Sequence, residues 1–267
     1  CIGREAIVEV GCGKGAFLEM LAGKGFSVTG FDPTYEGNNP KVLKRYFQKG
    51  VGITANGLVL RHVLEHIQDP YNFLLELLEA NSGSGKIYIE VPCFDWICEQ
   101  RAWFDIFYEH VNYFRISDFY RMFDSVIEIG RSFGGQYLYV VAELSKLKKP
   151  KINPADRVSF PENFTNLIAQ PCKSYSDQVA IWGGASKGVI FALLKERCFQ
   201  PITTVIDINP SKQGTYLAGT GLLVQSPQDA LRKMTPGATI YIMNSNYSNE
   251  IKQMSGNIFN YIEVDNE

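Results

Sequence analysis

Three histidines, His62, His66 and His110, are the only histidines in this chain of 267 residues. A neutral imidazole is a base at physiological pH, because its unperturbed pKa is about 6.5, and its nitrogens also bind metal ions. His62 and His66 are four residues apart and would share one face of a helix, so with His110 they could give three zinc ligands. The sequence HVLEH nevertheless lacks the HExxH order of zinc hydrolases. We therefore predict general-base chemistry and no metal site.

His110 is our candidate for the general base. It lies in the sequence YEHVNYF, where Glu109 precedes it and Tyr108 and Tyr113 offer hydroxyl groups. The carboxylate of Glu109 could orient the imidazole ring or bind a substrate hydroxyl, and His66 could donate to an oxygen that gains negative charge. An aromatic packing cluster with a buried ion pair is the alternative explanation of this segment.

A glycine-rich corner, GCGKG, follows the apolar sequence AIVEV and precedes an amphipathic helical pattern. Glycines let a ligand approach the backbone amides at a helix N-terminus. A dinucleotide site has the spacing GxGxxG, whereas the spacing here is GxGxG. Glu9 stands two residues before the first glycine, where a carboxylate suits an ammonium group better than a pyrophosphate. The corner therefore favours S-adenosylmethionine over NAD, and a turn that binds nothing is the alternative.

A second acid, Asp32, ends the next predicted strand in VTGFDP. Such a carboxylate accepts the hydroxyl hydrogens of an adenosine ribose, in NAD as well as in S-adenosylmethionine. We place His62 against the cofactor, with Arg61 either flanking the methionyl carboxylate or solvated. The residues predicted to bind the cofactor are Glu9, Gly11, Cys12, Gly13, Asp32, Pro33, Arg61 and His62.

The chain alternates strand and helix patterns, which predicts an α/β protein. Residues 1–144 carry the strand patterns AIVEV, FSVTGFD, GLVLRHV, GKIYIEV, SVIEIGR and QYLYVVAEL. The sequence SKLKKPKINPADR cannot continue a strand or helix through its prolines, so we predict a linker with a helical lead-in at 160–173. The pattern restarts with QVAIWGG. We therefore predict three parts, at residues 1–144, 145–177 and 178–267.

One interval is short for a doubly wound sheet. Only about 25 residues separate Asp32 from Leu58, where such a sheet normally places a helix, a strand and a second helix. We therefore expect residues to be missing from the sequence near GVGITANG, and others before Cys1.

Composition narrows the class of protein. The 26 Lys and Arg residues nearly balance 28 Asp and Glu residues, so the net charge of −2 provides no field that would attract nucleic acid or an anionic membrane. No apolar run approaches the roughly 18 residues of a membrane span. The six cysteines form no CxxC pair, which indicates reduced thiols. We expect a cytoplasmic, monomeric enzyme with a small-molecule substrate.

The motifs resemble those of the class I S-adenosylmethionine-dependent methyltransferases, whose first two motifs are similar to VEVGCGKG and GFDP. The sequences LRHVLEHIQDPYNFLLEL, GKIYIEVP and FDIFYEHVNYFRISDF resemble the sugar C-methyltransferases, which methylate a carbon of a nucleotide-linked keto-deoxysugar. VAIWGGASKGVIF, VIDINPSKQGTYLAGTG and SPQD are similar to the C-terminal domain of that family. The resemblance implies a doubly wound, Rossmann-like methyltransferase sheet followed by a smaller Rossmann-like α/β domain.

The resemblance also implies a mechanism, with His110 as base, Glu109 beside it and His66 assisting. Removal of a proton next to the ketone gives an enolate, whose carbon attacks the sulfonium methyl and leaves S-adenosylhomocysteine. Methylation of oxygen or nitrogen is one alternative; an oxidoreductase or a nucleotide-binding module is another. The chain departs from the family at Phe107, where a tyrosine is usual, and shows no cysteine-rich N-terminal zinc domain. Zinc is expected only in such a region.

A second glycine turn, IWGGASKG, again stands between a strand and a helix, with Lys187 beside it. Asp207, in the sequence VIDINP, could bind an NAD ribose, but the loop lacks the GxGxxG spacing. We favour a role for this turn in binding the nucleotide of the substrate, or in packing alone, with Asn244 as a further possible contact. The residues predicted to bind substrate are Tyr113, Lys187, Asn209 and Lys212.

Overall fold

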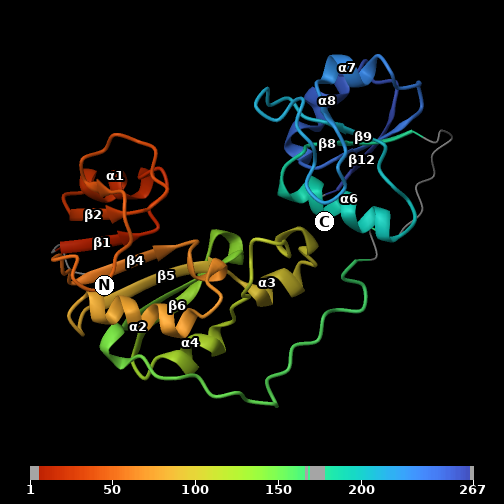
Figure 1. Cartoon of the computed structure of the whole chain (residues 1–267). Coiled ribbons are helices and arrows are strands. Elements are labelled where there is room, and N and C mark those ends of the chain that lie inside the picture. The colour runs from red at the N-terminus through yellow and green to blue at the C-terminus, as the bar shows by residue number, and fades with distance from the viewer. Residues whose placement is uncertain (1–5, 166–167, 169–177, 265–267) are drawn as a thin grey trace. The chain divides into compact units, whose positions relative to one another are not determined.

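The computed structural model describes residues 6–165, 168 and 178–264, which form two compact units (Figure 1). The first unit contains the described residues of Cys1–Glu99 together with Tyr108–Ser159. The second contains Gln100–Phe107 and the described residues of Phe160–Glu267. The units are therefore not contiguous in sequence, because residues 100–107 leave the first unit and join the second. Half of the helical lead-in predicted at 160–173, residues 166–167 and 169–173, lies outside the described residues.

The first unit is built on a seven-stranded sheet with the order β3-β2-β1-β4-β5-β7-β6. The five strands from β3 to β5 run parallel, and β7 pairs antiparallel with both β5 and β6. This order confirms the predicted doubly wound sheet. The strands are β1 (Ala6–Val10), β2 (Ser27–Phe31), β3 (Val42–Leu43), β4 (Gly57–Arg61), β5 (Lys86–Pro92), β6 (Val126–Ser132) and β7 (Tyr137–Glu143).

The central strands are buried because their side chains are apolar on both faces of the sheet. Leu58, Val59 and Leu60 of β4, for example, are each at most 4% exposed. The helices of this unit are α1 (Ala16–Gly23), α2 (Pro70–Ala80), α3 (Phe94–Glu99) and α4 (Ile116–Met122), with short 3-10 turns η1 (Leu64–His66), η3 (Phe133–Gly135) and η4 (Leu144–Lys146). Among the described residues, no helix has both the length and the apolar character needed to cross a membrane.

The short interval between β2 and β4 holds a complete connection. Strand β3 has two residues and pairs with the end of β2, and Phe47 then packs its ring against Phe31, with ring centroids 5.0 Å apart. Both rings are at most 5% exposed. Segment 33–56 contains no helix, yet the sheet reaches its full strand order. The short interval therefore does not require missing residues, contrary to our expectation from the sequence.

The second unit has a parallel five-stranded sheet with the order β10-β9-β8-β11-β12, which confirms a smaller Rossmann-like domain. Its strands are β8 (Val179–Trp182), β9 (Thr204–Ile206), β10 (Val224–Gln225), β11 (Thr239–Ile242) and β12 (Asn260–Glu263). Its helices are α6 (Ser186–Arg197), α7 (Pro227–Leu231) and α8 (Ser248–Met254), with 3-10 turns η2 (Trp103–Asp105) and η5 (Ser245–Tyr247). Ala180, Ile181 and Ile240 are fully buried and form part of its core.

Candidate active site

The first glycine corner has a backbone that only small residues fit. Gly11 has a φ of 71°, and its amide donates to the carbonyl of Phe31 over 2.8 Å. A Cβ atom at Gly11 would lie 2.5 Å from Cγ2 of Val63. Gly13 also has a positive φ, of 52°, but open space beside it. A cavity of about 570 Å³ opens at this corner and is lined by Gly13, Lys14, Thr34, Tyr35, Glu36 and Gly37.

Asp32 links this corner to the end of β2. Its Oδ2 accepts from the amide of Gly13 over 2.8 Å, and its Oδ1 accepts from the amide and the hydroxyl of Thr34 over 2.8 and 2.7 Å. A carboxylate has about four acceptor positions, so one position remains. Two ribose hydroxyls would therefore have to displace the hydroxyl of Thr34. Pro33 lies half-buried between the two residues.

Glu9 is a buried acid at the same corner, and it provides the test of whether a cationic cofactor fits. It is only 3% exposed, and its Oε2 has no hydrogen-bond partner. Burial raises the pKa of Glu9 to about 7, although the charge of Arg61 and a hydrogen bond from the Leu18 backbone act in the opposite direction. A buried acceptor without a partner is costly, and an ammonium group would satisfy it. The residues present therefore fit S-adenosylmethionine. Burial, followed by the charges of Glu9 and Asp32, raises the pKa of the Cys12 thiol to about 12.

Arg61 is engaged by the protein itself. Its guanidinium contacts Glu90 on β5, with Nη2 lying 2.8 Å from Oε1, and it stacks over the ring of Phe17 at 4.3 Å. The sequence had left Arg61 either beside the cofactor or solvated. Glu90 was missed, although its signal is the same as that of Glu9: an acid inside an apolar strand pattern. Hydrogen bonds from His62, Tyr88 and Arg61 lower the pKa of Glu90 to about 2.

The zinc alternative required His62 and His66 to lie on the same face of one helix. The structure does not place them on one helix. Strand β4 ends at Arg61, and His62 takes a left-handed backbone with a φ of 54° before the η1 turn begins. The ring of His62 lies between two acids, with Nδ1 3.4 Å from Glu65 and Nε2 3.5 Å from Glu90. These acids raise the pKa of His62 to about 9. The left-handed backbone at His62 therefore keeps this residue out of the η1 turn that carries His66.

His66 lies against His110 instead, with ring centroids 5.0 Å apart. Backbone hydrogen bonds hold their two segments together, because the amides of Val111 and Asn112 both donate to the carbonyl of Glu65 over 2.9 and 3.1 Å. Nδ1 of His66 lies 2.7 Å from the carbonyl oxygen of Glu109. The structure thus brings together two of the residues predicted to be catalytic.

The neighbours of His110 differ in how they contact this pair. Glu109 is exposed, and its carboxylate accepts from the hydroxyl of Tyr108, over 2.9 Å. Tyr108 is 77% exposed, and this hydrogen bond raises its pKa. The ring of Tyr113 lies 6.1 Å from that of His110 and 5.6 Å from that of Phe94. Glu109 thus contacts His66 with its backbone carbonyl, whereas its carboxylate contacts Tyr108.

Glu65 is a residue that the sequence reasoning missed. It is 1% exposed, and neither carboxylate oxygen has a hydrogen-bond partner, since its contact with His62 is an ion pair at 3.4 Å. One ligand atom each of Glu65, His66 and His110 lie within 4.8 Å of one another. Two imidazoles and a carboxylate suit several divalent cations, so this group could hold a metal ion. The signal in the sequence was an acid directly before the second histidine of HVLEH.

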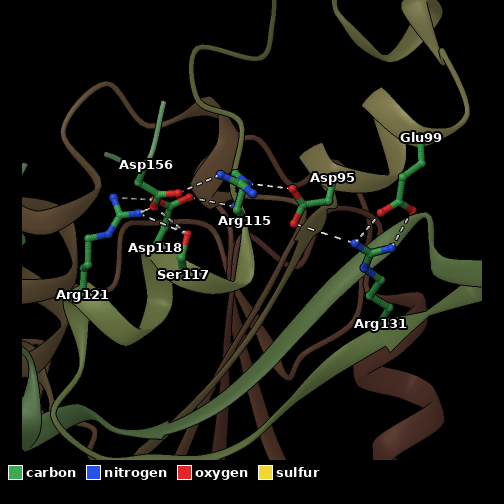
Figure 2. Close-up of polar contacts among 8 residues, drawn as sticks. All are labelled: Asp95, Glu99, Arg115, Ser117, Asp118, Arg121, Arg131 and Asp156. Carbon is green, nitrogen blue, oxygen red and sulfur yellow. Dashed lines mark hydrogen bonds and ion pairs between the residues drawn. The ribbon is translucent and has the colours of Figure 1, made fainter. Parts of the chain in front are cut away.

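An ion-pair network anchors both ends of the segment that carries His110 (Figure 2). Arg115, directly before α4, contacts Asp95 on α3 over 2.6 Å and Asp156 over 2.9 Å. Arg131 on β6 contacts Glu99 at the end of α3 over 2.8 Å. The segment between α3 and α4 therefore begins and ends at residues that ion pairs hold in the first unit. Residues 100–107, within this segment, belong to the second unit.

Of the residues predicted to contact substrate in the second unit, Lys187 and Asn244 line one cavity together with Asp207, whereas Asn209 and Lys212 are not part of its lining. Lys187 lies in the first turn of α6, and its Nζ stands 4.6 Å over the ring of Phe104. Lys212 pairs with Asp207 over 3.2 Å. The side chain of Asn209 accepts from the amide of Ser211 and so closes a turn, as that of Asn244 does with the amide of Asn246.

Comparison with known families identifies the two units. Residues 3–126 match the methyltransferase domain family, and residues 153–261 match the C-methyltransferase C-terminal domain family. The chain is therefore an S-adenosylmethionine-dependent methyltransferase, and it belongs to those that carry a C-methyltransferase C-terminal domain.

Solved structures of methyltransferases resemble part of the chain. An S-adenosylmethionine-dependent methyltransferase from Archaeoglobus fulgidus is 19% identical, covering 53% of this chain and 87% of its own, with a TM-score of 0.39. The N-methyltransferase NodS from Bradyrhizobium japonicum WM9 is 16% identical, covering 52% and 85%, with a TM-score of 0.36. The plantazolicin methyltransferase BpumL in complex with S-adenosylhomocysteine is 16% identical, covering 51% and 75%, with a TM-score of 0.40. No curated protein matches the sequence.

Proposed function

We propose that this enzyme methylates a carbon atom of a nucleotide-linked keto-deoxysugar, with His110 as the general base. The observation that carries the proposal is the contact of His110 with His66, whose rings lie 5.0 Å apart on two segments joined by backbone hydrogen bonds. The C-methyltransferase C-terminal domain supports carbon as the acceptor atom. The predicted cytoplasmic location and monomeric state stay predictions from composition.

The cofactor would be held at the first glycine corner. Glu9 would accept from the ammonium group, and Asp32 would bind the ribose. Bound there, S-adenosylmethionine supplies an electrophilic methyl group to which the substrate carbon bonds. Gly11 and Cys12 form the backbone of the corner, and Pro33, Arg61 and His62 surround it in this proposal.

His110 removes a proton from the carbon next to the ketone, and the electron pair moves to the carbonyl oxygen to give an enolate. A half-buried histidine suits this step, because the neutral ring can accept a proton near neutral pH. Tyr113, whose ring lies 6.1 Å from that of His110, would bind the substrate. The exposed pair of Tyr108 and Glu109 would contact sugar hydroxyls.

His66 would stabilise the enolate oxygen only in its protonated form. The carbonyl of Glu109 can only accept a hydrogen bond, so Nδ1 of His66 carries the hydrogen that it donates there. In the neutral ring Nε2 is then an acceptor. Donation from Nε2 to a developing oxyanion therefore needs the imidazolium.

Deuterium exchange in D₂O without S-adenosylmethionine tests the base directly. A nucleotide-linked 4-keto-deoxysugar should incorporate deuterium next to the ketone with the unaltered enzyme, and His110→Gln should abolish both exchange and methyl transfer. Affinity for S-adenosylhomocysteine should stay within about 3-fold, a change of well under 1 kcal/mol. His66→Gln should keep measurable exchange, because the base remains. Methylated product from His110→Gln within a few-fold of the normal rate would refute the assignment, and methylation of oxygen without exchange would indicate an O-methyltransferase.

A further inference from the structure

The buried acid Glu65 has no role in the proposed reaction, yet it lies beside the two histidines that do. It is 1% exposed, and its Oε1 lies 3.4 Å from Nδ1 of His62. Its Oε2 has no hydrogen-bond partner among the described residues. Burial of a carboxylate oxygen without a partner is costly, so a buried group of this kind calls for a ligand or another explanation. Glu65 therefore offers one oxygen that a cation could bind.

Two imidazoles lie close to this oxygen donor. One ligand atom each of Glu65, His66 and His110 lie within 4.8 Å of one another. The ligand atoms around a tetrahedral zinc ion are about 3.3 Å apart, because Zn–N and Zn–O bonds are about 2.0–2.1 Å long. The three side chains would thus have to approach one another by at most about 1.5 Å, which side-chain rotation can supply.

The contact that orients His66 is of the kind that holds metal-binding histidines. Nδ1 of His66 lies 2.7 Å from the carbonyl oxygen of Glu109, and it carries the hydrogen because a carbonyl can only accept. In the neutral ring the lone pair is then on Nε2. Histidines that bind metals usually donate their other ring N–H to a carbonyl or a carboxylate, which fixes the ring and makes it a better ligand. The protein therefore already orients one of the two imidazoles.

Backbone hydrogen bonds hold together the two segments that supply the three side chains. The amides of Val111 and Asn112 donate to the carbonyl of Glu65 over 2.9 and 3.1 Å. His66 is exposed and His110 is half-buried, whereas Glu65 is buried. The two nitrogen ligands are thus accessible from solvent, and the oxygen ligand is shielded from it.

We propose that Glu65, His66 and His110 bind a divalent transition-metal ion, with zinc as the ion that fits best. Two imidazoles and a carboxylate favour zinc and its neighbours over magnesium and calcium, which prefer oxygen ligands. Three protein ligands leave the fourth position of a tetrahedral ion for water. The sequence had indicated no metal here because HVLEH lacks the HExxH order, but the structure brings His110 to this acid and its neighbouring histidine.

A bound ion would inhibit the enzyme, and this consequence rests on the proposed function. A neutral imidazole has a lone pair on only one nitrogen. If that nitrogen of His110 binds an ion, it cannot take a proton from the substrate, so the two roles of His110 exclude each other. Zinc should therefore block both proton removal and methyl transfer.

Binding of zinc chloride to the whole chain tests the site without any substrate. Calorimetric titration should find zinc binding that Glu65→Gln weakens by about 10-fold or more, since loss of a group that merely orients a metal ligand already costs about 10- to 100-fold. The matched control is Glu109→Gln, which makes the same change at an exposed acid outside the group and keeps the carbonyl that contacts His66. This control should bind zinc as the unaltered protein does. The site is refuted if zinc does not bind, or if the two variants bind it equally well.

Cobalt(II) identifies the ligand atoms. Cobalt(II) chloride should give visible absorption typical of nitrogen and oxygen ligands, and Glu65→Gln should reduce this absorption. Thiolate charge-transfer absorption that Glu65→Gln leaves unchanged would place the ion at cysteines and refute the site. Magnesium chloride should bind more weakly than zinc chloride, and tighter binding of magnesium would contradict the choice of ion.

Inhibition separates this site from the proposed function. Zinc chloride should stop deuterium exchange and methyl transfer, EDTA should restore both, and Glu65→Gln should need about 10-fold more zinc for half-inhibition. Zinc binding that Glu65→Gln weakens, but that leaves exchange unchanged, would refute His110 as the base and leave the metal site intact. Inhibition at the same zinc concentration in both proteins would refute the metal site and leave the base assignment intact.

Discussion

The carbonyl oxygen of Glu109 lies 2.7 Å from Nδ1 of His66. Because a carbonyl cannot donate, this contact fixes the hydrogen on Nδ1 and leaves Nε2 for the substrate side of the ring. It also connects the η1 turn to the segment that carries His110. One hydrogen bond therefore has two roles, in holding the segment and in selecting the tautomer.

These two roles can be separated by substitution of His66. The amide nitrogen of an asparagine can replace Nδ1 as donor to Glu109, but asparagine has no atom at the place of Nε2. We expect His66→Asn to keep the unfolding free energy within about 1 kcal/mol and to lower kcat about 10- to 100-fold. His66→Ala should lower both, as measured by urea unfolding and by methyl transfer. Normal turnover by His66→Asn would show that Nε2 takes no part.

Glu9 predicts an unusual dependence of stability on pH. Its pKa is about 7 in the folded protein, compared with the ordinary value of 4.5 expected in the unfolded chain. Between these two pH values the folded protein therefore keeps a proton that the unfolded chain releases. Stability should therefore fall as pH rises from 4.5 to 7, by about 3 kcal/mol. Glu9→Gln should remove this fall. Urea unfolding at pH 5 and pH 7.5 measures the difference, and equal pH dependence in both proteins would contradict it.

The same group should give cofactor binding the opposite dependence on pH. Only the ionised carboxylate of Glu9 pairs with an ammonium group, and its ionised fraction rises about 10-fold between pH 6 and pH 8 for a pKa of about 7. We expect S-adenosylhomocysteine to bind about 10-fold more tightly at pH 8 than at pH 6. Glu9→Gln should bind weakly at both. A flat calorimetric profile for the unaltered protein would place the ammonium group elsewhere.

The strand order and the site could be predicted from the sequence to different degrees. The sequence predicted the positions of the apolar strands, the glycine corners and the two aspartates, because each of these features depends on a few adjacent residues. The pairing of His66 with His110 depends on hydrogen bonds between segments more than 40 residues apart, and the left-handed backbone at His62 has no signal in residue type. Glu90 was missed for the same reason, since its partners Arg61 and His62 come from another part of the chain.

The ion-pair network in Figure 2 predicts a loss of stability that an exposed ion pair would not cause. Arg115 contacts both Asp95 and Asp156, and its side chain is only 30% exposed. Removal of one partner from a half-buried network leaves charges unpaired, so Arg115→Ala should cost about 2 kcal/mol. The control is Lys148→Ala, which breaks an exposed pair with Asp124 and should cost less than about 1 kcal/mol. Equal losses in urea unfolding would contradict a structural role for the network.

The glycine corner gives a sharper comparison between two neighbouring residues. Both Gly11 and Gly13 have a positive φ, but only at Gly11 would a Cβ meet another side chain, Cγ2 of Val63, at 2.5 Å. Gly13→Ala should therefore cost about 1 kcal/mol from its backbone alone, and Gly11→Ala should cost more than about 2 kcal/mol. The double variant Gly11→Ala with Val63→Ala should regain part of the difference, because it removes the atom that clashes. If Gly11→Ala and Gly13→Ala unfold at the same urea concentration, the close approach of Val63 is not what requires glycine there.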